Sequence, residues 1–422
     1  GKRGPKTAAP NLRVHTGLFQ SPIHIEGFRK IFLSTGTPAP AASSMRASAS
    51  KVAKAIVKEN KKSMRKHAKF ASKLQKLRGE SGIPVEGDCQ YSSPLYSGVG
   101  KKPMQPASQC VYTMSENATT EKKVVSMATK NKLCSRSRVK KRCPHHEDED
   151  EGKCTSNLDI EESIGNELQW AEDCLRDLVK KGTQITEVTT DGDSAAHKAA
   201  KQLYNEGLLD QAPIHNLDTR HLSCSQRKKI NMKSFSSHMF PGRTKAKRQS
   251  VHGHFACDLA MRCQGEYQKA IVDTAGDLQK LVNKMKRIRK AIRWCYKGRH
   301  NKCRRSSYMC GGIGKKDNWF SKSPYFKYGF KLTPTEKDDE LLSECIREKL
   351  GIKMLKKTAR NRNTQKSEAV NRGMRRSLPK NVTFKKNFEA RAHCAVHAIN
   401  EGPASSIMSL CDTLGVPIPD GS

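Results

Sequence analysis

The order of apolar runs between residues 83 and 217 restricts the possible folds of this chain more than any other feature. Three strand-like runs come first, and two shorter ones follow after segments with helical spacing. The strand-like runs are Ile83–Tyr91, Gln109–Ser115, Lys122–Lys130, Ile185–Thr190 and Ile214–Leu217. The helical segments are Ile164–Leu178, where apolar residues recur every three or four positions, and Ala195–Leu209. The predicted order is therefore β-β-β-α-β-α-β, an α/β fold with a mixed five-stranded sheet and flanking helices.

Three acidic residues lie at landmarks of this pattern. Asp88 is on the first predicted strand, Asp191 directly follows the fourth, and Glu368 begins a helix predicted over about residues 364–378. Each has an ordinary explanation when taken singly, because Asp before Gly favours a turn and a first-turn Glu favours a helix N-terminus. Asp193 is an alternative second acid if the fourth strand ends later. Together the three carboxylates predict a site for two Mg²⁺ or Mn²⁺ ions.

The charge of the chain predicts a polyanionic partner. Lys and Arg number 79 and Asp and Glu number 41, which gives a net charge of +38. Nucleic acid is the first candidate, and an anionic membrane surface is the competitor. Neither an apolar run that spans a bilayer nor a signal peptide is present, so a nuclear protein without a membrane segment is expected. Basic tracts at 284–290, 356–362 and 372–376 are expected to bind phosphates without reading sequence.

Composition and apolar spacing also predict the organisation of the regions outside the predicted sheet. Pro38–Ser50 is rich in Pro, Ala and Ser and is predicted to be a linker. Ser48–Leu77 is predicted to be a basic helix, which either contacts DNA or is a solvated surface helix. We therefore expect an accessory helical and linker region at 1–80, the first part of the core at 81–221, a basic helical insertion with Cys and His at 222–355, and a C-terminal part of the core at 356–422.

Cysteine usage indicates metal sites. Fifteen cysteines without a secretory signal favour metal ligation over a disulfide framework. One candidate for a tetrahedral structural Zn²⁺ lies between residues 295 and 310, with free loop thiols as the alternative. A second candidate lies between residues 134 and 154, where a loop without metal is an equally good explanation. The first set is Cys295, His300, Cys303 and Cys310, and the second is Cys134, Cys143, His146 (or His145) and Cys154. Cys257 and Cys263 are predicted to be buried helix thiols.

Four stretches, in their order along the chain, resemble the Mutator-like transposase domain family. The stretches are Gly87–Pro94, Gln105–Tyr112, Val188–Ser194 and Asn363–Asn371. The similarity covers most of residues 10–422. The predicted element order also resembles the ribonuclease H-like fold, in which the first strand carries one catalytic Asp, the fourth strand ends at the second, and a late helix carries the third acid.

The resemblance implies that Asp88, Asp191 and Glu368 form a DDE triad that holds two Mg²⁺ or Mn²⁺ ions. It further implies a protein that cuts transposon ends, joins the freed 3′-OH to target DNA, and acts as a homo-oligomer on DNA. One departure is that the family usually has a Cys-x-x-His element, whereas residues 218–221 begin with Asp218 and keep His221. Three alternatives remain: a non-catalytic, sequence-tolerant DNA-binding protein that retains the fold, a nuclease without strand transfer, and a zinc-dependent RNA-binding module.

Overall fold

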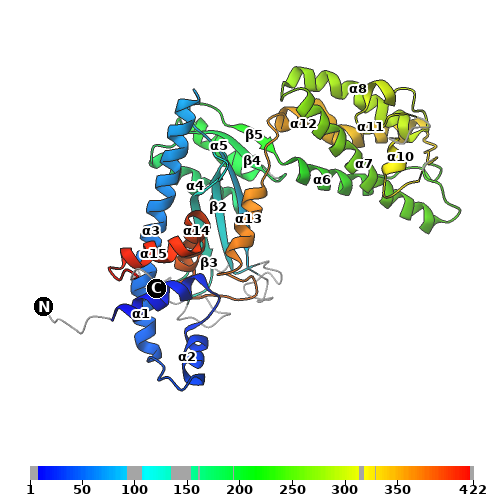
Figure 1. Cartoon of the computed structure of the whole chain (residues 1–422). Coiled ribbons are helices and arrows are strands. Elements are labelled where there is room, and N and C mark those ends of the chain that lie inside the picture. Colours follow the sequence, from blue (N-terminus) through cyan, green and yellow to red (C-terminus); the bar gives the residue numbers. More distant parts are fainter. Residues whose placement is uncertain are drawn as a thin grey trace. The chain divides into compact units, whose positions relative to one another are not determined.

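The chain forms two compact units. The computed structural model describes residues 8–92, 107–134, 154–159, 162–192, 194–312, 318–327 and 329–418 (Figure 1). The first unit comprises Gly1–Val188, Ser194–Pro213 and Thr364–Ser422, and the second comprises Thr189–Asp193 and Ile214–Asn363. Within the described part of the chain, no helix is both long and apolar enough to cross a membrane.

A five-stranded mixed sheet has the strand order β3-β2-β1-β4-β5. The strands are β1 Ile83–Tyr91, β2 Gln109–Glu116, β3 Val124–Asn131, β4 Ile185–Thr190 and β5 Ile214–Leu217. β1 pairs with β2 and β2 pairs with β3, both antiparallel. The Ile83 N–H donates to the Gln184 carbonyl at 2.8 Å, so β1 and β4 begin side by side and run in the same direction. All six residues of β4 are buried, as expected for a central strand rich in β-branched residues.

The predicted strands are confirmed, with small shifts at two of them. β1, β4 and β5 have the predicted bounds, and β2 extends by one residue. β3 begins at Val124 because Lys122 has a φ of 50°, a left-handed conformation that belongs to the connection rather than to a strand. Helix α5 ends earlier than predicted because Gly207, with a φ of 73°, terminates it.

Helices cover both faces of the sheet in the first unit. The helices of this unit are α1 Ala9–Gln20, α2 Ile25–Ser34, α3 Ala42–Leu77, α4 Glu167–Lys180, α5 Ala195–Asn205, α13 Gln365–Met374, α14 Phe388–Glu401 and α15 Pro403–Thr413, of which α1, α2 and α15 pack on other helices. One apolar cluster joins the sheet to α4 and α5, and a second joins its other face to α13 and α14. The side chains of β1 point alternately to the two faces of the sheet. Ile83, Val85 and Cys89 belong to the first cluster, whereas Glu86 and Asp88 face α13.

The linker predicted over Pro38–Ser50 is wrong from Ala42 onward, where α3 begins. Met45 and Ala49 are buried against neighbouring helices, and this tertiary burial favours helix in a segment that composition alone marks as a linker. The basic helix predicted over Ser48–Leu77 is confirmed as part of α3. The four-region division of the chain stays a prediction.

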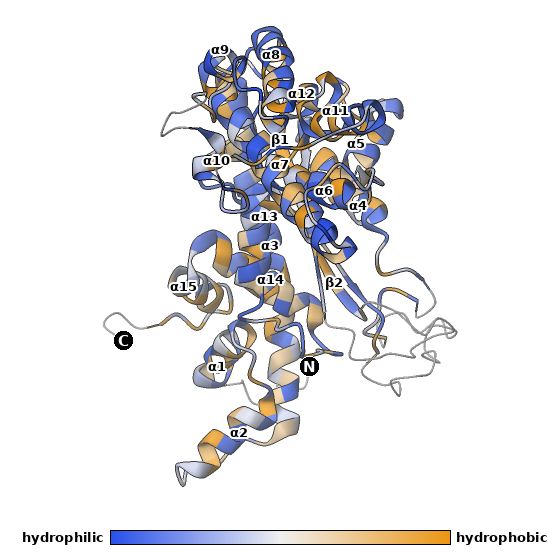
Figure 2. Ribbon diagram, turned by 90° about the vertical axis from the view of Figure 1, so that its right-hand side faces the viewer, coloured by the Kyte–Doolittle hydropathy of each residue, from blue (hydrophilic) through white to orange (hydrophobic). Residues whose placement is uncertain are grey.

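The second unit is mainly helical around its own core, as predicted for residues 222–355. Its helices are α6 Thr219–Asn231, α7 Lys245–Asp273, α8 Leu278–Tyr296, α9 Cys303–Ser306, α10 Trp319–Lys322, α11 Glu336–Leu350 and α12 Ile352–Thr358. The core contains Phe255, Ile288, Trp319 and Leu342. Helices such as α7 carry both hydrophilic and hydrophobic residues along their length (Figure 2), because one face is buried in this core and the other is solvated.

His393 on α14 generates a prediction about pH. Its ring is 3% exposed, and its Nδ1 accepts a hydrogen bond of 2.8 Å from the amide of Asn60 on α3. Burial is the main cause that lowers the pKa of His393 from 6.5 to about 3. The folded chain therefore excludes a proton that the unfolded chain accepts below pH 6.5, so stability should fall as the pH drops from about 6.5 toward 3.

His393→Gln should make the free energy of unfolding less dependent on pH below 6.5, by up to about 1.4 kcal/mol per pH unit. The measurement is urea unfolding of both proteins at pH 7, 6 and 5. The exposed His238 provides the matched control, and His238→Gln should keep the wild-type dependence. An unchanged dependence in His393→Gln would show that this ring is not the responsible group.

Candidate functional site

The polar face of β1 holds helix α13 through two side chains. The backbone N–H of Ser367 donates to Glu86 Oε1 at 2.7 Å, and its hydroxyl lies 3.1 Å from the same oxygen. The Asn371 amide donates to Asp88 Oδ2 at 2.7 Å. Residues two apart on a strand share a face, and residues four apart on a helix lie one turn apart, so the two pairs have matching spacing. α13 is therefore fixed against β1 in one register.

Glu86 acts as a cap for α13 from a neighbouring strand. The side chain of Glu86 is fully buried, and its carboxylate accepts the backbone N–H of Ser367, the third residue of the helix. Thr364, at the N-cap position, makes no side-chain capping hydrogen bond to this helix. A carboxylate at this end also complements the helix dipole. Burial raises the pKa of Glu86, and the Lys122 ammonium, 3.7 Å from Oε2, opposes this rise. Removal of Glu86 would leave a buried N–H of α13 without a partner.

Two of the three predicted acids lie on the two elements of this strand–helix contact, Asp88 on β1 and Glu368 on α13. Asp88 on β1 is half-buried, and its Oδ1 also accepts the Cys89 N–H at 2.8 Å. Glu368 lies in the first turn of α13, next to Ser367, and is exposed. Asp191 is exposed and directly follows β4, in a segment grouped with the second unit. The alternative Asp193 lies outside the described residues.

Several buried side-chain oxygens lie on α13, β1 and β2 near this contact. Four of them have no hydrogen-bond partner among the described residues, and in the β1–β2 register Thr113 lies opposite Asp88 and Ser115 opposite Glu86. Directly opposed residues lie on one face of a sheet, the face that α13 covers. The four atoms are Glu86 Oε2, Thr113 Oγ1, Ser115 Oγ and Asn371 Oδ1. Carboxylate, amide and hydroxyl oxygens are ligand types that Mg²⁺ or Mn²⁺ accepts, and ordered water can also bond to them.

Glu86 and Asn371 are not among the site residues predicted from the sequence. The alternation of Glu86, Asp88 and Gln90 along one strand marks a polar face, and this pattern was available in the sequence. Nothing in the sequence shows that Asn371 donates to Asp88, because the two residues are 283 positions apart.

The four residues predicted as the first zinc set come together in the second unit. Cys295, His300, Cys303 and Cys310 are all buried, and their ligand atoms lie within 4.8 Å of one another. The Cys295 sulfur is 3.9 Å from that of Cys310 and 3.4 Å from His300 Nδ1, which is 3.6 Å from the Cys310 sulfur. A tetrahedral Zn²⁺ with ordinary bond lengths separates two sulfurs by about 3.8 Å and a sulfur from a nitrogen by about 3.6 Å. The cluster therefore fits a structural zinc ion.

Buried charges support this cluster. The thiols of Cys295 and Cys303 donate to the Cys310 sulfur and lower its pKa, which favours a thiolate ligand. The Arg262 guanidinium on α7 lies 3.8 Å from the Cys295 sulfur, and its Nε donates to Glu266 at 2.9 Å. Both charged side chains are fully buried. The pair ties α7 to the cluster and places a positive charge beside the sulfurs.

The second predicted zinc set is only partly covered by the described residues, and the two predicted helix thiols differ in burial. Of the second zinc set, Cys143 and His146 lie outside the described residues, so this set stays a prediction. Cys134 is buried and Cys154 is half-buried. Of the two predicted helix thiols, both on α7, Cys263 is fully buried as predicted, whereas Cys257 is half-buried.

Asp218, which replaces the family's Cys, caps helix α6. Its Oδ1 accepts the backbone N–H of Arg220 at 2.6 Å and that of His221 at 3.4 Å. Asp is among the preferred residues at this position, so the substitution has a structural reason.

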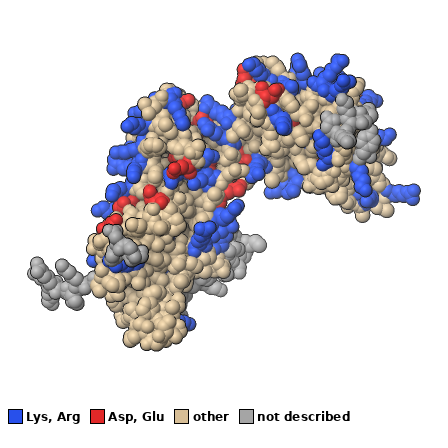
Figure 3. Space-filling model, in the orientation of Figure 1, with Lys and Arg blue, Asp and Glu red and all other residues tan. Residues whose placement is uncertain are grey.

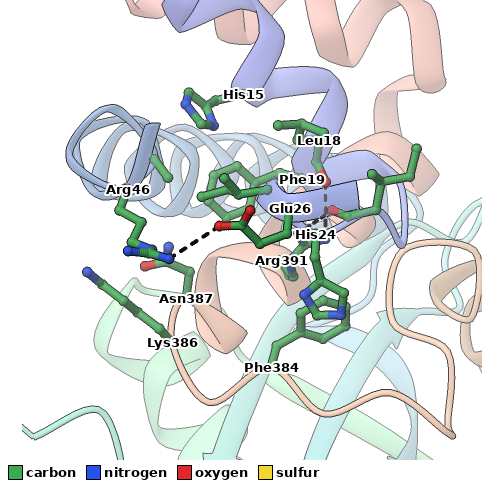
Figure 4. A pocket seen from close by; sticks show the side chains of 13 residues that line it. His15, Leu18, Phe19, His24, Glu26, Arg46, Phe384, Lys386, Asn387 and Arg391 are labelled. Carbon is green, nitrogen blue, oxygen red and sulfur yellow. Dashed lines mark hydrogen bonds and ion pairs between the residues drawn. The ribbon is translucent and has the colours of Figure 1, made fainter. Parts of the chain in front are cut away.

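A cavity of about 270 Å³ beside α1 has a structural explanation (Figure 4). Arg391 is 8% exposed and donates to the carbonyls of Leu18 at 3.0 Å and Ser21 at 2.7 Å, at the C-terminal end of α1. Its guanidinium lies 4.1 Å from the Phe384 ring, and burial lowers its pKa to about 10. The charge of Arg391 is therefore used to hold a helix end, and none of the predicted site residues lines this cavity.

A family model described as Mutator-like transposase matches residues 1–310. The matched range includes Asp88, Asp191 and the Cys–His cluster, and Glu368 lies beyond it. No curated protein and no solved structure matches the chain.

The geometry of the cluster generates a prediction about zinc. Cys303→Ser should lose about one zinc ion per chain relative to the wild type and should unfold at a lower temperature, because a structural zinc contributes directly to folding. Zinc content after purification and thermal unfolding with and without a chelator are the measurements. Cys263→Ser is the matched control, since this thiol is equally buried but lies outside the cluster. Equal zinc contents in the two variants would remove the assignment.

Proposed function

The chain belongs to the Mutator-like transposase family, and on that premise we propose that it is a metal-dependent DNA transposase. It cleaves DNA at transposon ends and joins the freed 3′-OH to a target duplex, as a homo-oligomer in the nucleus. The net charge of +38 supports a polyanionic partner, and the family makes that partner DNA.

A ribonuclease H-like core is part of this proposal. The strand order β3-β2-β1-β4-β5, the antiparallel pairs of β1 to β3 and the helices on both faces support it. Asp88 lies on β1, Asp191 follows β4 directly, and Glu368 lies on the late helix α13, which is the arrangement that the resemblance implies.

The observation that carries the proposal is the contact of Asp88 with α13. In our assignment Asp88, Asp191 and Glu368 hold two Mg²⁺ or Mn²⁺ ions, with Asn371 as an added oxygen ligand. When bound, such ions activate a water molecule and stabilise the leaving 3′ oxygen of the cleaved strand. The chain itself supplies orientation, because the Asn371 amide and the Cys89 N–H hold the two oxygens of the Asp88 carboxylate.

Glu86 is a positioning residue in this assignment. It anchors the first turn of α13, and Glu368 is the residue that follows its partner Ser367. A site of this kind tolerates displacements of only about 0.5 Å, so a rigid anchor beside the third acid matters for activity. The zinc cluster is assigned a structural role in the second unit, since its four ligands leave no open coordination position.

The catalytic assignment predicts that Asp88→Ala, Asp191→Ala and Glu368→Ala each lower Mg²⁺- or Mn²⁺-dependent nicking about 100-fold or more. The substrate is DNA that carries candidate terminal repeats, and DNA binding by each variant is measured in parallel. Glu389→Ala is the matched control, because Glu389 is also an exposed first-turn acid, on α14. Tight DNA binding by the wild type without cleavage under any metal would instead identify a non-catalytic DNA-binding protein that retains the fold.

The role of Asn371 predicts a metal-specific defect. Asn371→Ala should raise the Mg²⁺ concentration for half-maximal nicking by about tenfold, and Asn371→Asp, which keeps an oxygen ligand, should restore it. Asn400→Ala removes an equally buried amide that binds the Val124 backbone, and it should affect stability alone. Equal losses of activity in all three variants, with an unchanged Mg²⁺ requirement, would assign Asn371 a structural role.

A further inference from the structure

Helix α3 has one buried side and one side that is almost entirely cationic. The helix covers Ala42–Leu77, 36 residues, which corresponds to about 54 Å at 1.5 Å per residue. Val52, Ile56, Met64 and Ala71 are among the residues that it buries. Packing on that side fixes which residues point outward.

The outward side carries one positive charge per turn. The residues are spaced by three or four positions, and all eight are exposed: Lys51, Lys54, Lys58, Lys61, Arg65, Lys69, Lys73 and Lys76. We call this row the α3 cationic stripe. Lys51 and Lys76 are 25 positions apart, which corresponds to about 38 Å, with a charge about every 5.4 Å. Figure 3 shows Lys and Arg side chains gathered along the edge of the first unit where α3 runs in Figure 1.

Acidic residues of the described chain do not neutralise the stripe. Glu59 is the only acid of α3, and its ion pair is with Lys62, which is outside the stripe. None of the eight stripe residues forms an ion pair with a described residue. Like charges four residues apart destabilise a helix, and four such pairs occur among the residues of the stripe. A solvated surface helix ordinarily mixes both signs, so this arrangement is better explained by an anionic partner.

A hollow adjoins the N-terminal part of the stripe. Its volume is about 630 Å³, and Lys54, Lys58 and Lys61 line one side of it. Residues Thr155 to Asn157 offer hydroxyl and amide groups on another side, and Glu389 is the one acid among its lining residues. The stripe therefore borders a concave surface that carries both polar and apolar side chains.

Duplex DNA has the dimensions and charge that this surface fits. It presents one phosphate per about 1.7 Å of axis, and one helical turn measures about 34–36 Å, close to the length of the stripe. Seven of the eight residues are lysines, which contact phosphates as point charges and do not read bases through a planar fork as arginine does. The charge and its regular spacing therefore favour sequence-independent contact with a phosphate backbone.

We propose that the α3 cationic stripe is a binding surface for the phosphate backbone of duplex DNA and that it holds about one turn of the duplex. The choice of DNA rests on the proposed function, but the stripe contains none of the residues assigned to catalysis. DNA affinity and DNA cleavage are therefore separable by mutation.

The test is the salt dependence of DNA binding by the full chain. Lys58→Gln/Lys61→Gln/Arg65→Gln removes three charges of the stripe and keeps good helix formers. Lys180→Gln/Lys198→Gln/Lys201→Gln is the matched control, with three exposed, unpaired cations on α4 and α5. The dissociation constant is measured from 50 to 200 mM NaCl on two duplexes of unrelated sequence.

The stripe variant should weaken binding to both duplexes equally and reduce the slope of log K against log salt by about 2.7, three contacts at 0.9 each. The control should change the slope by less than about 1. Circular dichroism at 222 nm checks that both variants keep their helices. A stripe variant with the wild-type slope on both duplexes would overturn the proposal.

This outcome is distinguishable from failure of the proposed function. A wild type that binds DNA through the stripe but never nicks it supports the stripe and contradicts the transposase. A wild type that nicks DNA, with an unchanged slope in the stripe variant, supports the enzyme and contradicts the stripe.

Discussion

The docking of α13 on the polar face of β1 is the contact on which the candidate site depends. Glu86 anchors the first turn of the helix, and Asp88 accepts from Asn371 one turn later. Both carboxylates lie on β1, which is held between β2 and β4. Helix α13 is therefore anchored to the most constrained strand of the sheet. These two contacts give α13 a single register against β1, which apolar packing alone would not specify. The position of Glu368 along β1 is fixed with it.

The two units reach stability by different means. The first unit uses a sheet with apolar clusters on both faces, which is sufficient for a core of ordinary size. The second unit is helical and contains the Cys–His cluster. Beside this cluster, the buried ion pair of Arg262 and Glu266 links α7 to the ligand residues. A buried ion pair of this kind adds little to the free energy of folding by itself. Its positive charge, however, lies beside sulfurs that a metal would hold as thiolates.

Part of this arrangement was predictable from the sequence because it is local. The strand bounds of β1, β4 and β5, the helical second unit and the grouping of Cys295, His300, Cys303 and Cys310 follow from short-range periodicity and spacing. Glu86 and Asn371 could not be assigned in this way, since their partners lie 281 and 283 positions away. The start of α3 was also missed, because burial of Met45 and Ala49 outweighs a composition typical of linkers.

The sequence by itself determined the order of the sheet elements between residues 83 and 217, the charge, and the residue types available for metal binding. Periodicities of two and of 3.6 residues are properties of the local backbone, and net charge needs no structure at all. Only the tertiary structure decided which polar residues meet. Asp88 and Asn371 come together because strand and helix pack at one register, and the lysines of α3 form a single stripe because the opposite side of that helix is buried. Contacts between distant segments depend on packing geometry, which no local pattern specifies.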